Sequence, residues 1–102
     1  MADLQELTER IRAAAALVSG LDRSIKLDLR GEGVIHVDGT DVTNDDAAAD
    51  LVVSVSRADL ILLGKGQLDP TRAMMTGRVR MSDMALAFSL QTRIQALFEK
   101  AA

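Results

Sequence analysis

The amino-acid sequence predicts an α+β domain in which helices cover one face of a β-sheet. Residues 25–30 and 51–55 alternate between apolar and polar side chains, the pattern of strands with one buried face. Residues 3–18 and 84–100 instead carry apolar side chains at the spacing of amphipathic helices. The whole chain has 102 residues, a length that suits a single domain.

The first predicted element is an amphipathic helix over residues 3–18. Asp3 and Glu6 have the spacing of a capping box at its start, and Gly20 is expected to end it. Its apolar stripe consists of Leu4, Leu7, Ile11, Ala14, Ala15 and Val18. We expect this stripe to cover one side of the sheet.

A β-hairpin is predicted next. Residues 25–30 alternate strictly, Gly31-Glu32-Gly33 turns the chain, and residues 34–38 return with Ile35 and Val37 on the same buried face. His36 is then expected on the opposite face of its strand.

The strand at residues 51–55 leads into a short helix. Ser56 and Asp59 again have the spacing of a capping box, and the apolar run at residues 60–63 follows them. Gly64 is a suitable residue for a left-handed helix C-terminus, so we expect the helix to end there.

A second short helix, a strand and a long helix complete the predicted order. Asp69 and Pro70 fit an N-cap followed by proline at the first helical position, and Gly77 closes that segment. Residues 78–82 form the strand, with Arg78 and Arg80 on its solvent face. Asp83 caps the long helix.

Charge and composition exclude several functions. The net charge is −3, with 5 basic and 11 acidic residues in the first fifty positions and 7 and 4 in the rest. The basic second half either attracts anionic head groups or is an ordinary solvated surface, and the pattern favours the latter. Nucleic acid is not expected as a partner, because the net charge is negative and the chain has only two aromatic residues, Phe88 and Phe98.

The sequence does not predict an enzyme, a cofactor or a metal site. His36 is the only histidine and there is no cysteine, so a zinc site would lack its usual ligands. The aspartates between Asp38 and Asp50 lack the spacing of a calcium loop, and Gly64-Lys65-Gly66 lacks that of a phosphate loop. The N-terminus is too polar for a signal peptide and no apolar run approaches a span of about 20 residues. We therefore expect a soluble, cytoplasmic protein.

Residues 49–91 closely resemble the sterol carrier protein family, whose members are also called non-specific lipid-transfer proteins. The resemblance rests on ADLVVSVS, SRADLILLGKGQLDP, MMTGRVRMSDM and ALAFSLQ, and it extends more weakly back to about Leu27. Two departures are Ser82 and Ala85, where the family often has glycine. The resemblance implies a five-stranded, mostly antiparallel sheet covered on one face by helices over an apolar tunnel. It also implies a short strand at residues 41–43.

The resemblance further implies non-catalytic binding and carriage of a lipid, namely a fatty acid, a fatty acyl-CoA, a sterol-like molecule or a phospholipid. Transient membrane contact and a monomer or weak homodimer are expected with it. A competing hypothesis is a protein interaction or dimerisation module that uses the same apolar surface. The family's pattern places the tunnel lining at Leu60, Leu63, Leu68, Met74, Met75, Met81, Met84 and Phe88, with Gln91 as a polar contact near one end.

Two features of the residues bear on this lining. Four of the five methionines fall between Met74 and Met84, and methionine repacks around apolar partners of different shape, although a Met-rich core would look the same. The long helix has a body-facing stripe in its later part, formed by Leu90, Ile94, Leu97, Phe98 and Ala101. Its first turns, residues 84–88, are apolar all round, so we expect them to be covered on both sides.

Overall fold

The computed structural model describes residues 3–18 and 23–102, so the predicted helix end at Gly20 lies outside the described residues. Strands and helices follow one another in the predicted order. In these two ranges the elements are α1 (Leu4–Leu17), β1 (Ile25–Asp28), β2 (Val34–Asp38), β3 (Asp41–Thr43), β4 (Leu51–Val55), α2 (Arg57–Gly64), α3 (Pro70–Met75), β5 (Val79–Met81) and α4 (Met84–Ala101).

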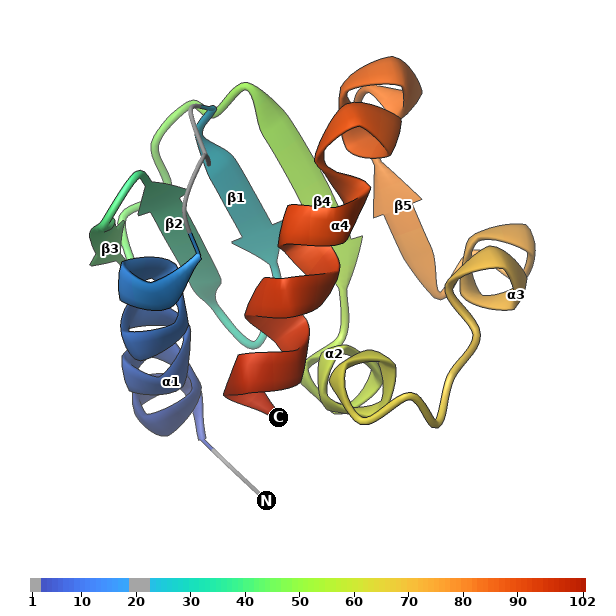
Figure 1. Cartoon of the computed structure of the whole chain (residues 1–102), viewed down its shortest axis with the longest axis horizontal. Coiled ribbons are helices and arrows are strands. Elements are labelled where there is room, and N and C mark those ends of the chain that lie inside the picture. Colours follow the sequence, from blue (N-terminus) through green and yellow to red (C-terminus); the bar gives the residue numbers. More distant parts are fainter. Residues whose placement is uncertain (1–2, 19–22) are drawn as a thin grey trace.

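The five strands form one sheet in the order β3-β2-β1-β4-β5 (Figure 1). The pairs β1–β2, β2–β3 and β4–β5 are antiparallel, whereas β1 and β4 are parallel. Leu27 lies opposite Ile35 on one side and Val53 on the other, so the apolar residues of three strands share one face. The expected five-stranded, mostly antiparallel sheet is confirmed, and so is the short strand at residues 41–43.

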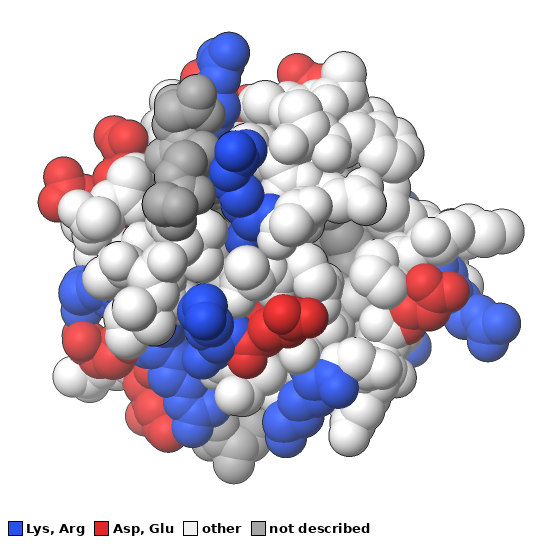
Figure 2. Space-filling model, in the orientation of Figure 1, with Lys and Arg blue, Asp and Glu red and all other residues white. Residues whose placement is uncertain are grey.

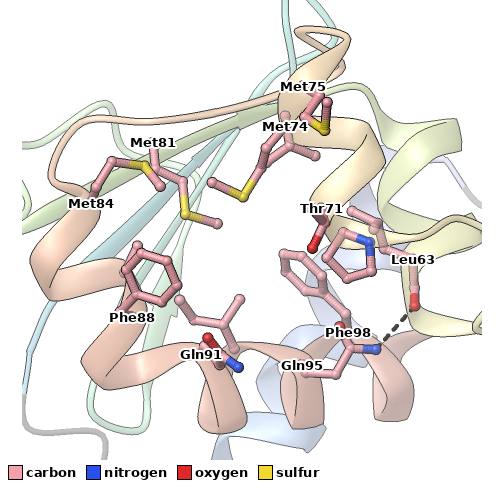
Figure 3. A pocket seen from close by; sticks show the side chains of 14 residues that line it. Leu63, Thr71, Met74, Met75, Met81, Met84, Phe88, Gln91, Gln95 and Phe98 are labelled. Atoms are coloured by element: carbon pink, nitrogen blue, oxygen red, sulfur yellow. Dashed lines mark hydrogen bonds between the residues drawn. The ribbon is translucent and has the colours of Figure 1, made fainter.

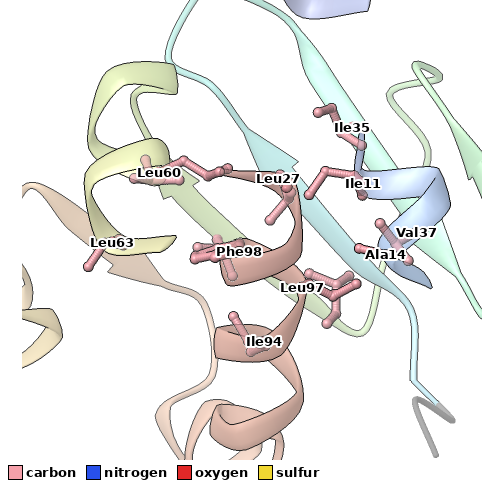
Figure 4. Close-up of a cluster of buried hydrophobic side chains, with 14 of the residues drawn as sticks. Ile11, Ala14, Leu27, Ile35, Val37, Leu60, Leu63, Ile94, Leu97 and Phe98 are labelled. Carbon is pink, nitrogen blue, oxygen red and sulfur yellow. The ribbon is translucent and has the colours of Figure 1, made fainter. Parts of the chain in front are cut away.

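Helices α1 and α4 lie side by side over one face of this sheet, and α2 packs beside the lower part of α4 (Figure 1). Figure 4 shows Ile11 of α1 and Leu97 of α4 gathered with Leu27 and Val37 of the sheet. All four side chains are buried. Each contributes about 1.5–3 kcal/mol relative to an exposed position. The core therefore lies between the sheet and these helices, as the apolar stripes predict.

Side-chain caps begin all four of the described helices. Asp3, Ser56, Asp69 and Asp83 accept hydrogen bonds from the backbone N–H groups of Glu6, Asp59, Thr71 and Leu86 at 2.8–3.1 Å. Each cap satisfies a donor that the helix itself leaves unpaired, a contribution of about 1 kcal/mol. These caps fix where α3 and α4 start, and both starts lie at the candidate site described below.

The opposite face of the sheet carries polar contacts. His36 lies on that face, and its Nε2 atom is 3.0 Å from the carbonyl oxygen of Ala48. Lys26, on the neighbouring strand, pairs with Asp46 at 2.8 Å. The irregular segment before β4 thus runs beside this face, and His36 has the surface position that the strand pattern predicts.

Ser82, where the family often has glycine, extends the pairing of β4 and β5. Its Oγ accepts from the Val52 N–H at 2.9 Å, and its own N–H donates to the Val52 carbonyl oxygen at 3.0 Å. A side-chain oxygen therefore takes the place of the next backbone acceptor along the strand.

Two of the predicted turns differ from the structure. The hairpin turn begins one residue early, because Arg30 has a left-handed φ of 54° and β1 ends at Asp28. Gly64 is the last helical residue of α2, and the left-handed conformation falls on Gly66, whose φ is 73°. The glycine at position 64 is required for another reason: a Cβ there would lie 2.2 Å from the Phe98 carbonyl oxygen of α4.

We expect Val53→Thr to destabilise the protein by about 1–3 kcal/mol, because it places a hydroxyl without a partner in the core. Val53 is fully buried. The matched control is Val52→Thr on the opposite face, which should change stability by less than about 0.5 kcal/mol. Urea unfolding measures both, and equal midpoints for the two variants would contradict the face assignment.

Replacing Gly64 by alanine should destabilise the protein by about 1–3 kcal/mol, the usual effect of overpacking. An exposed helical glycine would behave oppositely and gain about 1 kcal/mol on the same change. Thermal unfolding distinguishes the two, and a raised melting temperature would show that α2 and α4 are not in close contact at this point.

Candidate functional site: an apolar pocket between α3, β5 and α4

A pocket of about 590 Å³ lies between α3, β5 and α4 (Figure 3). All but a few of the side chains that line it are apolar. These side chains come from four elements, α2, α3, β5 and α4. The lining consists of Leu63, Pro70, Thr71, Met74, Met75, Val79, Met81, Met84, Ala87, Phe88, Gln91, Ile94, Gln95 and Phe98. Its volume lies within the range of about 300–1,000 Å³ that is typical of small-molecule sites.

One face of α4 forms the longest wall. The lining positions from Met84 to Phe98 recur every three or four residues, which places them along one side of the helix. Leu90 and Leu97 fall on the other side and are buried toward the sheet. Ile94 and Phe98 were predicted to face the body alone, but both border the pocket as well as the core. Helix α4 therefore belongs to the core and to the pocket at once.

Helix α3 forms the facing wall and is held mainly at its C-terminal end. Only Ala73 of this helix is buried. After Gly77, whose φ is 76°, the Arg78 backbone N–H donates to the Ala73 carbonyl oxygen at 2.8 Å. The Arg30 side chain reaches from the β1–β2 turn and donates to the Gly77 carbonyl oxygen, also at 2.8 Å.

Arg78 ties this end of α3 to α2. Its guanidinium donates two hydrogen bonds to the Asp59 carboxylate, at 2.8 and 3.2 Å. These hydrogen bonds and the negative charge of Asp59 raise the pKa of Arg78 above its usual value. Arg78 was predicted on the solvent face of its strand, and it is exposed, but its charge is paired within the protein.

Large apolar side chains are exposed along the edge of the pocket. Met75 is 83% exposed, Phe88 is 68% exposed and Met84 is 42% exposed. The prediction that the first turns of α4 are covered on both sides is therefore wrong. In Figure 2 the surface over the start of α4 consists mainly of uncharged side chains, and the molecule is hollowed between it and α3.

Three polar side chains interrupt the apolar lining. Thr71 lies on α3, and Gln91 and Gln95 lie one turn apart on α4. The Gln95 amide nitrogen donates to the Leu63 carbonyl oxygen of α2 at 3.0 Å, the dashed line in Figure 3. Figure 3 shows Met81, Met84 and Phe88 at the opposite end from Thr71 and Gln95.

The structure brings seven of the nine residues predicted for the ligand site into this lining: Leu63, Met74, Met75, Met81, Met84, Phe88 and Gln91. Leu60 and Leu68 are placed elsewhere, since both are buried in the core and neither borders the pocket. Both follow the apolar pattern of α2 and its exit, which does not distinguish a core position from a pocket wall.

The prediction missed seven lining residues, namely Pro70, Thr71, Val79, Ala87, Ile94, Gln95 and Phe98. Helical spacing could have found some of them. Continuing from Phe88 and Gln91 in steps of three or four gives Ile94, Gln95 and Phe98. Val79 alternates with Arg80 and could have been paired with Met81 on the same face of β5.

The chain belongs to the SCP-2 sterol transfer family, whose family model matches residues 4–95. No curated protein sequence is similar enough to this chain to count as a match.

Solved structures share the fold. Sterol carrier protein 2-like 2 from Aedes aegypti has a TM-score of 0.71 at 23% identity, over 85% of this chain and 92% of that one. A palmitated form of the same mosquito protein, determined by NMR, has a TM-score of 0.66 at 24% identity, over 91% and 95% of the two chains. Sterol carrier protein domain 2 of Helicoverpa armigera has a TM-score of 0.65 at 17% identity, over 93% and 87%.

Residues 3–18 and 23–102 contain no group of three or more His, Cys, Asp or Glu side chains that could hold a metal ion. Among the helices of these same residues, none is both long enough and apolar enough to cross a membrane.

We expect Phe88→Gln to change the free energy of unfolding by only about 0.5 kcal/mol, because the ring is mostly exposed. Leu90→Gln, two positions further along α4, should cost about 2–5 kcal/mol or more, because it removes buried apolar contact and buries an amide. Thermal melting of the two variants compares the faces of one helix. Equal losses would mean that Phe88 is part of the packed core.

Proposed function

We propose that the chain is a single lipid-binding domain that holds one lipid in the pocket between α3, β5 and α4 and carries it without chemical change. The observation that carries the proposal is the pocket itself, an apolar space of about 590 Å³ edged by exposed Met75, Met84 and Phe88. Membership of a sterol transfer family supports a lipid as the ligand. So does the palmitated form of a protein with the same fold.

The lining suits an apolar body of variable shape. Met74, Met81 and Met84 surround one end, and their unbranched thioethers can repack around chains or rings. A ligand in contact with Phe88 and Met75 would remove their exposed apolar surface from water, which contributes about 25 cal/mol per Å². These side chains therefore stabilise a bound lipid while contributing little to the fold.

The absence of a catalytic step is part of the proposal. Of the residues that the structure describes, those in the lining include no histidine, cysteine, lysine or carboxylate, so they offer no acid–base pair and no activated nucleophile. Thr71 supplies the one hydroxyl group of this lining, and no base accompanies it.

The alternative is an interaction or dimerisation module, and one observation favours it. Met75 and Phe88 are large, exposed apolar side chains on the two facing walls of the pocket, as expected of a surface that a protein partner covers. Both functions would use the same side chains.

Lipid extraction and mass spectrometry of the purified protein distinguish the two. We expect about one lipid per chain. Phe88→Gln and Met84→Gln should weaken binding of a fluorescent lipid, because they remove apolar side chains from the lining. The control Thr92→Gln, at an exposed position of α4 outside the lining, should leave binding unchanged. Lipid-free protein that dimerises through α4 would support the interaction module instead.

A further inference from the structure

The sequence makes methionine the principal oxidisable side chain of this protein. The chain contains five methionines and one histidine, and it contains no cysteine, tryptophan or tyrosine. No cysteine thiolate therefore competes for a mild oxidant such as a peroxide. Four of the five methionines line the pocket, namely Met74, Met75, Met81 and Met84. A peroxide that reacts with this protein thus finds most of its targets around one site.

These four methionines fall into two pairs. Met74 and Met81 are partly buried and pack against the hydrophobic core. Met75 and Met84 are instead exposed at the edge of the pocket, Met75 by 83% and Met84 by 42%. An oxidant dissolved in water therefore meets the thioethers of Met75 and Met84 before those of the inner pair.

Met84 combines access to water with a place on the pocket wall. It is the first residue of α4 and lies at the end of the pocket where Met81 and Phe88 also lie (Figure 3). Less than half of its surface is exposed. Met75 is the last residue of α3, and most of its side chain is in water. Of the two exposed methionines, Met84 is therefore the one whose polarity matters more for a lipid in the pocket.

Oxidation would change the polarity of this side chain. When hydrogen peroxide reacts with a thioether, its O–O bond breaks, one oxygen atom forms an S=O bond, and the other leaves as water. The sulfur gives up two electrons, which reduce the peroxide. The product is methionine sulfoxide, which is polar, and dedicated reductases convert it back to methionine.

We propose that Met84 is a modification site through which a peroxide lowers the occupancy of the pocket. This inference rests on the proposed lipid-binding function. A sulfoxide at this position stays hydrated while the pocket is empty, but a bound lipid would cover it without offering a hydrogen bond. The fold should tolerate the change, because Met84 is exposed and does not belong to the core. By the same coupling, a bound lipid should slow the oxidation of Met84.

The test treats the lipid-free protein with hydrogen peroxide at neutral pH and takes samples over time. Peptide mass spectrometry locates each sulfoxide, and titration with a fluorescent fatty acid gives the Kd. Met75 should be oxidised first, with a change in Kd of less than about twofold. The Kd should then rise about tenfold as the Met84 sulfoxide forms, equivalent to about 1.4 kcal/mol. The melting temperature should fall by less than about 4 °C.

Two variants separate the positions. Met84→Leu keeps an apolar side chain of about the same volume but has no sulfur to oxidise. Whatever its affinity before treatment, its Kd should not change while the Met75 sulfoxide forms. Met75→Leu should still lose affinity about tenfold as Met84 is oxidised. Methionine sulfoxide reductase should restore the affinity of the oxidised original protein.

Several outcomes would overturn the proposal. An unchanged Kd with Met84 fully oxidised would remove oxidative control and leave lipid carriage intact. So would a loss of affinity that follows Met75 oxidation or that Met84→Leu does not prevent, because another position would then decide. A larger fall in melting temperature would mean that the fold is lost. Oxidation of Met74 or Met81 before Met84 would contradict the division into two pairs. Failure of the untreated protein to bind the probe would overturn both proposals.

Discussion

The structure depends on the packing of α4 against two different partners. Its Leu90 and Leu97 side is buried against the sheet and α1, and its Gln91 and Phe88 side borders the pocket. The position of the helix is fixed at Gly64, where α2 approaches so closely that no side chain fits beside the Phe98 carbonyl oxygen. The contact between α2 and α4 at Gly64 therefore fixes the position of α4 both in the core and as a wall of the pocket.

Two of the basic side chains in the second half of the chain form ion pairs. The second half of the chain carries an excess of basic residues, yet Arg57 pairs with Glu32 and Arg78 pairs with Asp59. The first pair joins the start of α2 to the β1–β2 turn and the second joins α2 to the residue after Gly77, while the lining of the pocket stays uncharged. The interpretation of this basic half as ordinary protein surface, which the sequence pattern favours, stays a prediction.

Most of the helices and strands could be predicted from the sequence, because their signals are local, whereas the five-stranded sheet was expected only from the family resemblance. Each helix start is predicted by an N-cap residue, namely Asp3, Ser56, Asp69 or Asp83. The alternation of apolar and polar side chains predicts both strands of the hairpin and β4. The pocket was only partly predictable, because its lining depends on how distant elements meet. Leu60 and Leu63 look alike in sequence, yet only Leu63 borders the pocket.

The errors share that cause. Residues 84–88 are apolar on every side, which predicts a helix covered on both sides, but Phe88 is exposed. The pocket separates α3 from α4 at this point, and nothing in the local sequence pattern shows that separation. Gly64 suits a helix end by its type, whereas the structure requires it for a contact with a residue more than thirty positions away. Local patterns do not contain such contacts.

The unequal anchoring of the two pocket walls bears on the rates at which a ligand enters and leaves. Moving α4 outward would expose Leu90, Leu97 and the core beneath them, at a free-energy cost close to that of unfolding. Moving α3 would expose Ala73 and break the few polar contacts at its end, and glycines with left-handed φ at positions 66 and 77 flank it. The slow step of exchange should therefore be a local opening of α3, with a barrier that depends on the Arg30 and Arg78 contacts and not on the stability of the domain.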